Sequence, residues 1–188
     1  MIKESLRIAS IVVLTLAFVS CNSNEKFKIT KGNVGQLTSK TTIKEFEKIF
    51  EKDSIITNLS EGSLGDNYFQ DDDEYLVFEK GGKHLLTIVP KEQLDSTSTI
   101  KSIQIFDERY KTESGLSLNS TFSQIDANNK IAKIETSFSS ATLFIDELNA
   151  TITIDKEELG LKKFSTQKVV KEQIPDLAKI KSFIVWFN

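Results

Sequence analysis

YLVFEKGGKHLLTIV, residues 75–89, consists of two apolar runs joined through the pair Gly81-Gly82. A glycine pair between two such runs is typical of a β-hairpin, so we predict strands over 75–79 and 83–89. Other short or alternating apolar runs predict further strands, over residues 100–106, 131–138, 142–145, 151–154 and 183–187. The last run is apolar on both faces, which predicts a strand inside the sheet or covered on both sides. Its Trp186 is interpreted as a core residue.

Two passages resemble each other, and each precedes one group of the predicted strands. Thr42 is followed three residues later by Glu45, and Thr121 by Gln124, which is the spacing of a capping box at a helix start. The first predicted helix places its apolar side chains on one face: Ile43, Phe46, Ile49 and Phe50. The second ends near residues 128–129, and a short third helical stretch is expected over 169–174, before Pro175.

Glycines also precede both helix starts, at residues 35 and 115. A duplication and a coincidence of two similar helix starts both remain open. Short hairpin-linked strands with few helices predict the α+β class, with a mainly antiparallel sheet, two to three short helices and, under duplication, two helix-then-strands halves. The segment 60–73 is rich in Gly, Asp and Asn and is expected to be a long loop.

Size and charge limit the classes of partner. The 188 residues suffice for one ordinary domain, and 39% hydrophobic with 27% charged residues is typical of a folded protein. The net charge is -3, so the chain offers no excess of cations to neutralise phosphates. This argues against nucleic acid as a partner, and against electrostatic adhesion to anionic lipid headgroups.

The N-terminus has the features of an export signal. Lys3 and Arg7 precede an apolar run over residues 8–19. As a helix this run rises about 18 Å, which is short of the roughly 30 Å hydrocarbon core, so a signal peptide is favoured over a membrane span. The run ends in Phe18-Val19-Ser20-Cys21 and resembles the lipobox of bacterial lipoproteins, in which a small residue precedes an obligatory cysteine. Phe18 departs from the commonest residue there, leucine.

The lipobox resemblance implies a diacylglycerol thioether on Cys21, cleavage after Ser20 and acylation of the new amino terminus. We therefore expect a signal peptide over 1–20, a lipidated tether over 21–28 and one domain over 29–188. The alternatives are an ordinary signal peptide with a coincidental cysteine, or a buried hydrophobic helix. Because Cys21 is the only cysteine, a disulfide or a cysteine-based zinc site cannot form.

Passages at both ends and in the centre of the domain resemble a family of small Gram-negative lipoproteins under envelope-stress (sigma-E) control. They are residues 29–38 with Thr41-Thr42, residues 99–106 with 112–125, and residues 177–186. The family has no assigned function, so the resemblance implies an outer-membrane, palmitate-bearing lipoprotein of the periplasm and no enzyme chemistry. This chain departs from a member of that family that carries two cysteines in its second half, because it has no cysteine pair there.

Candidate chemical groups are few. His84, the only histidine, lies in a predicted strand. The sequence has no G-x-S-x-G motif to supply a serine nucleophile for a catalytic triad with it, so an ordinary half-exposed strand histidine is favoured. The acidic run Asp71-Asp72-Asp73-Glu74 lacks the spacing of a calcium loop and is interpreted as solvated, with a Ca²⁺ site as the open alternative. The run Asp107-Glu108-Arg109-Tyr110 is interpreted as a polar strand exit with a surface ion pair.

These features favour a non-enzymatic lipoprotein of the bacterial cell envelope, anchored through Cys21 in the outer membrane. We expect no catalytic residue, no metal and no cofactor. The domain is interpreted as a binding or structural module for an envelope protein or a cell-wall partner. The alternatives are an inhibitor or sequestering module for an envelope enzyme and, with least support, a carboxylate-dependent hydrolase.

Overall fold

The structure, a computed structural model, describes residues 25–60 and 72–187. Cys21 and most of the expected loop over 60–73 lie outside the described residues. The described residues are mostly β: strands form one sheet of eight and one of four, beside only two short α-helices. The expectation of an α+β class is therefore wrong. Its physical cause is that several strands are two to five residues long, too short to give an alternating apolar signal.

The large sheet contains all the longer strands. They are β4 (Ser54–Asn58), β5 (Glu74–Phe78), β6 (His84–Pro90), β7 (Ile100–Ile105), β9 (Lys133–Thr136), β10 (Ser140–Ile145), β11 (Ala150–Asp155) and β12 (Ser182–Trp186). Their spatial order is β4-β5-β6-β7-β12-β11-β10-β9, and every neighbouring pair is antiparallel. The hairpin predicted around Gly81-Gly82 is confirmed as β5–β6, and β12 lies inside the sheet.

The small sheet lies near the start of the described chain. It consists of β1 (Lys28–Thr30), β2 (Asn33–Val34), β3 (Leu37–Thr38) and β8 (Lys111–Thr112). β1 pairs with β2 antiparallel and with β8 parallel. It is preceded by the 3₁₀ helix η2 (Glu25–Phe27), so the end of the expected tether belongs to the folded part.

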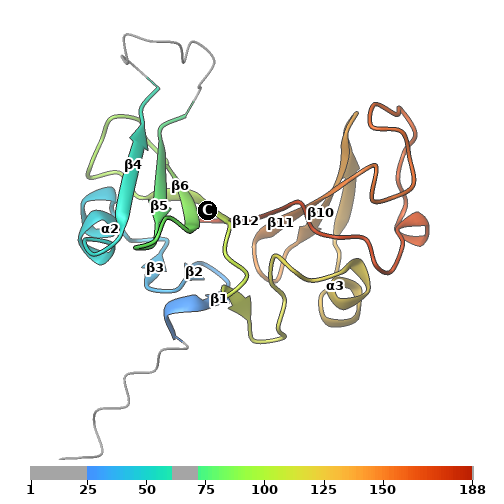
Figure 1. The fold of residues 1–188 in the computed structure, drawn as a ribbon, viewed down its shortest axis with the longest axis horizontal. Coiled ribbons are helices and arrows are strands. Elements are labelled where there is room, and N and C mark those ends of the chain that lie inside the picture. The colour runs from blue at the N-terminus through green and yellow to red at the C-terminus, as the bar shows by residue number, and fades with distance from the viewer. Residues whose placement is uncertain (1–24, 61–71, 188) are drawn as a thin grey trace, which may run out of the picture.

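The two α-helices are α2 (Ile43–Ile49) and α3 (Phe122–Asn128), which confirms both predicted helix starts. The third expected helix is only a 3₁₀ turn, η3 (Lys171–Gln173), and the N–H of Val169 just before it bonds to Thr136 of the edge strand. Along one side of the large sheet, α2, the small sheet and α3 follow one another (Figure 1). The other side of the sheet is crossed by none of the elements in 25–60 and 72–187 (Figure 1).

The core fills the space between the sheet and this covering layer. A single row of apolar side chains crosses all eight strands on the covered face: Ile55, Val77, Leu86, Ile105, Phe183, Ile152, Leu143 and Ile134. The six central members of the row are fully buried, and Phe46 of α2 and Ile125 of α3 pack into the same cluster. Burial of this apolar area is what holds the covering layer on the sheet.

The two halves of the large sheet repeat one plan. In each half a helix is followed by four strands in a meander, and the last strands of the halves, β7 and β12, pair at the centre. The detail repeats as well. The first two helical N–H groups of α2 donate to Ser98 and Ser96, just before β7, and those of α3 donate to Ala178 and Asp176, before β12. The repeat therefore extends well beyond two similar helix starts.

Candidate functional site

The uncovered side of the large sheet carries a second cross-strand row, one residue out of step with the core row. Its members are Ile56, Leu76, Thr87, Gln104, Ile184, Thr151, Phe144 and Lys133, one from each strand in spatial order. We call this row and its neighbours on the same side the open face. Because successive side chains of a strand alternate between faces, a one-residue offset separates the open face from the core.

The eight-strand row of the open face is short of charge and rich in apolar and hydroxyl groups. In the eight-strand row only Lys133, on the edge strand, is charged. Ile56 is 52% exposed, and Leu76, Ile184 and Phe144 are half-buried although no described element covers them. Side chains of this kind on an outer surface are typical of a site that contacts another molecule.

A hollow of about 540 Å³ lies on the open face over β10, β11 and β12. Its floor combines three apolar side chains with three threonine hydroxyls: Phe144, Ile184, Trp186, Thr142, Thr151 and Thr153. The indole Nε1 of Trp186 donates to Thr151 at 3.0 Å. Asn149, in the β10–β11 turn, donates to the carbonyl of Trp186 at 2.7 Å and accepts from its N–H at 2.8 Å. The bond to Thr151 fixes the Trp186 ring in the hollow, and the two bonds to Asn149 fix its backbone.

The corresponding part of the first half is filled by an aromatic stack. The His84 ring lies between Phe78, with 4.6 Å between ring centroids, and Phe106, with 3.8 Å. Burial lowers the pKa of His84, and its Nε2 lies 3.1 Å from both the Leu86 carbonyl and the Thr87 hydroxyl. The prediction of a half-exposed strand histidine is thus refined, because His84 packs between two aromatic rings.

The predicted surface ion pair at residues 107–110 is a partly buried cluster instead. The Asp107 side chain is fully buried and accepts from the backbone N–H and Nε of Arg109, both at 2.9 Å. Arg109 also forms a bidentate pair with Glu79, and Lys83 lies 3.2 Å from Asp107. These hydrogen bonds hold the pKa of Asp107 below its usual value despite its burial, and they raise that of Arg109. The groups satisfy one another, which indicates a structural role.

The acidic run over 71–74 is divided by the fold, and Asp71 lies outside the described residues. Asp73 is buried and accepts from the Ser60 N–H and hydroxyl at 2.9 Å each and from the Leu94 N–H at 2.6 Å. The hydrogen bonds hold its pKa below the usual value. Asp72 pairs with Lys101 at 2.9 Å. Across residues 25–60 and 72–187, no group of three His, Cys, Asp or Glu side chains is placed to hold a metal ion.

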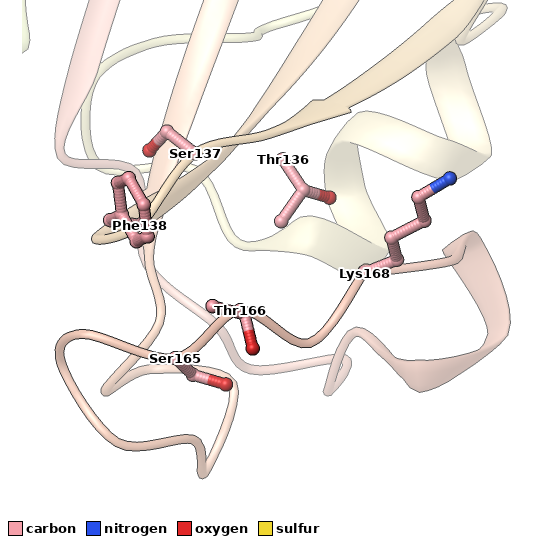
Figure 2. Close-up of a pocket in the computed structure, with 6 residues that line it drawn as sticks. All are labelled: Thr136, Ser137, Phe138, Ser165, Thr166 and Lys168. Atoms are coloured by element: carbon pink, nitrogen blue, oxygen red, sulfur yellow. The ribbon is translucent and has the colours of Figure 1, made fainter.

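A second hollow, of about 300 Å³, lies at the far end of the second half, between the β9–β10 turn and residues 165–168 (Figure 2). Phe138 stands at the turn and is 68% exposed. Thr136 accepts from the Val169 N–H at 3.0 Å, and the buried Lys156 donates to the Ser165 carbonyl. The first bond holds this segment against the edge strand β9, and the second holds it against the end of β11, so we interpret the hollow as part of the cover of a sheet edge.

Comparisons with known proteins give one result on the fold. No family model matches the chain, and no curated protein matches it. Among solved structures, the chain is similar to the crystal structure of the uncharacterized protein YfeY from Escherichia coli, with a TM-score of 0.51 and 12% identity. The match covers 85% of this chain and 99% of that one. The chain therefore shares its fold with a bacterial protein that is itself uncharacterized. In the part of the chain that the structure describes, no helix has the length and apolarity needed to cross a membrane.

Sequence reasoning missed the hollow around Trp186. Trp186 was assigned to the core, but it is half-buried and lies on the open face with Ile184. The sequence does contain a signal of an exposed face, because Thr151 and Thr153 alternate with Ile152 and Ile154. These threonines lie on the same face of the sheet as Trp186 of the neighbouring strand β12. Lipidation of Cys21 lies outside the described residues.

Proposed function

We propose that this protein is a lipid-anchored lipoprotein of the bacterial outer membrane, whose domain binds a protein partner through the open face. The lipobox at Cys21 and the resemblance to envelope-stress lipoproteins support the anchor and its location. Two or more acyl chains on one terminus give stable anchoring, whereas a single chain binds only marginally.

The observation that carries the binding role is the contrast between the two faces of one sheet. The covered face is filled by aliphatic and aromatic side chains, whereas the open face keeps half-exposed Phe144, Ile184 and Trp186 beside threonine hydroxyls. Protein interfaces are depleted of charge at their centre and enriched in aromatic groups, with tryptophan among their most frequent energetic anchors. The hollow matches this composition, and its Trp186 ring is already fixed by hydrogen bonds.

The lining of the hollow favours binding over hydrolysis. Among the described residues that line it, Asp146 has the one titratable side chain, whereas glycoside hydrolysis requires two carboxyl groups about 5–10 Å apart. The buried carboxylates Asp73 and Asp107 accept several hydrogen bonds each and have lowered pKa values, which is unsuited to a general acid.

The anchor is tested by metabolic labelling with radioactive palmitate in cells that express the full chain. We expect label on the wild-type protein and on a Ser20→Ala control, which keeps a small residue before the cysteine. Cys21→Ser should lose the label completely and remain as the uncleaved precursor. Label that persists on Cys21→Ser would contradict the anchor.

The binding face is tested by photo-crosslinking in cells, with benzoylphenylalanine placed at Ile184 on the open face or at Glu51, exposed after α2. We expect one discrete protein adduct from position 184, at least tenfold stronger than any adduct from position 51. Equal adducts from both positions would overturn the proposal. An adduct that muramidase degrades would identify the partner as cell-wall glycan and would also overturn it.

A further inference from the structure

The described chain begins at a point that is firmly attached to the domain. The Phe27 ring packs edge-on against buried Tyr110, with 5.0 Å between centroids, and the Arg109 guanidinium lies 4.5 Å over its face. Arg109 is itself held by Glu79 and Asp107. From Phe27 the chain passes directly into β1. Cation–π and edge-to-face contacts of this kind fix the position from which any preceding segment departs.

The segment between this point and Cys21 is short. Glu25, the first described residue, follows Cys21 by four positions. Four residues span at most about 14 Å even when fully extended. A domain of roughly 160 residues has a radius of gyration of about 15 Å, which corresponds to about 40 Å across. A lipid anchor on Cys21 therefore cannot reach around the domain to its opposite side.

The departure point lies on the covered side of the large sheet. β1 belongs to the small sheet, which sits between α2 and α3 (Figure 1), and η2 precedes it directly. The open face lies on the other side of the large sheet (Figure 1). The short reach from Cys21 and the fixed Phe27 together restrict which side of the domain meets the bilayer.

We propose that the domain stands on its membrane with the small sheet toward the lipid and the open face directed away from it. The partner of the open face is then a water-soluble protein, or the water-exposed domain of another protein. It approaches the open face from the aqueous side. It is not a protein embedded in the anchoring bilayer. This inference rests on the lipid anchor and the open-face binding of the proposed function, and it adds the side from which the partner comes.

The test uses the full processed lipoprotein in vesicles of phosphatidylethanolamine and phosphatidylglycerol that carry a nitroxide on the lipid headgroup. Lipid occupies the only native cysteine, so an introduced cysteine is the single site for a fluorophore. One variant is Lys111→Cys on β8, an exposed position paired with Lys28 of β1, and the other is Thr153→Cys on the open face. We expect headgroup quenching at position 111 to exceed that at position 153 at least threefold.

A lengthened tether supplies the matched control. Twenty Gly and Ser residues inserted between Ser23 and Asn24 give a reach of about 80 Å, which exceeds the size of the domain. The difference in quenching should then fall below 1.5-fold. An unchanged difference would show that surface adhesion rather than the tether orients the domain, and would overturn the mechanism.

Failure of the orientation can be told apart from failure of the anchor. Intact mass spectrometry of the same samples reports the acyl groups on Cys21. A lipidated protein that is quenched equally at both positions, or more strongly at 153, overturns the orientation alone. A protein that carries no lipid on Cys21 overturns both proposals.

Discussion

The two halves of the large sheet share a helix, a four-strand meander and a pattern of helix-start hydrogen bonds, but they differ in the arrangement of their polar and aromatic side chains. In the first half, Asp107, Arg109 and Glu79 form a hydrogen-bonded cluster at the strand ends, and His84 fills the open face between two phenylalanines. In the second half, the open face over β10, β11 and β12 keeps a hollow beside Trp186.

This difference indicates that two halves with the same arrangement of helix and strands have different roles. The first half attaches the N-terminal segment, because its Arg109 contacts Phe27. Polar clusters that are satisfied internally serve this purpose, since they fix geometry without leaving groups for a ligand. The second half keeps its aromatic and threonine side chains available, and we assign the partner to it.

The largest expected effect comes from the polar cluster of the first half. Asp107→Asn removes a buried charge that compensates Arg109, and it should lower the free energy of unfolding by about 3 kcal/mol. The matched change in the second half is Asp155→Asn, which removes the more exposed pair with Lys181 and should cost less than about 1 kcal/mol. Urea unfolding measures both. Equal decreases in the free energy of unfolding of the two variants would contradict the proposed difference between the halves.

The same cluster predicts a dependence on pH. The pKa of Asp107 is lowered in the folded state by its hydrogen bonds to Arg109, against about 3.9 in an unfolded chain. Its contribution to stability is therefore complete above the unfolded value and is lost as pH falls through the folded pKa. The difference between wild type and Asp107→Asn should be constant from pH 5 to 8 and decrease steadily as the pH falls below about 3.9. A difference that stays constant down to pH 2.5 would contradict this assignment.

The smallest expected effect on stability comes from the N-terminal caps of the two helices, which also differ between the halves. Thr42 and Glu45 cap each other reciprocally, at 2.9 Å and 3.3 Å. At the second helix, Gln124 accepts from the Thr121 N–H at 3.0 Å, while the Thr121 hydroxyl lies 3.1 Å from that of Ser123. Thr42→Ala should therefore cost about 1 kcal/mol and Thr121→Ala about half of that. Thermal unfolding followed by circular dichroism measures the pair, and the reverse order would show that the caps do not distinguish the halves.

Much of the large sheet could be predicted from the sequence. The hairpin at Gly81-Gly82, the inner position of β12 and both helix starts follow from local signals, namely glycine turns, apolar runs and capping-box spacing. The class was predicted wrongly because β2, β3 and β8 have two residues each, and β4 reads Ser-Ile-Ile-Thr-Asn without a clear alternation. A strand of two residues shows no alternation, and β8 depends on pairing with the distant β1, which no local pattern reports.

The candidate site was harder to predict than the fold. A run such as Phe183-Ile184-Val185-Trp186 is apolar throughout, so it cannot show which of its faces a neighbouring layer covers. That depends on the side of the sheet to which α2, the small sheet and α3 pack. The burial of Asp107 could not be predicted for a related reason, since its partner Lys83, and Glu79, which pairs with Arg109, come from the β5–β6 hairpin.

The most direct test of the central claim compares the two halves of the open face in one assay. Benzoylphenylalanine at Thr153 reports the partner, while a second substitution is made either in the hollow, Trp186→Ala, or in the aromatic stack, Phe106→Ala. Circular dichroism confirms that each variant is folded. We predict that Trp186→Ala lowers the yield of the adduct at least tenfold and that Phe106→Ala changes it less than twofold. Equal yields from the two variants would contradict the claim that the second half binds the partner.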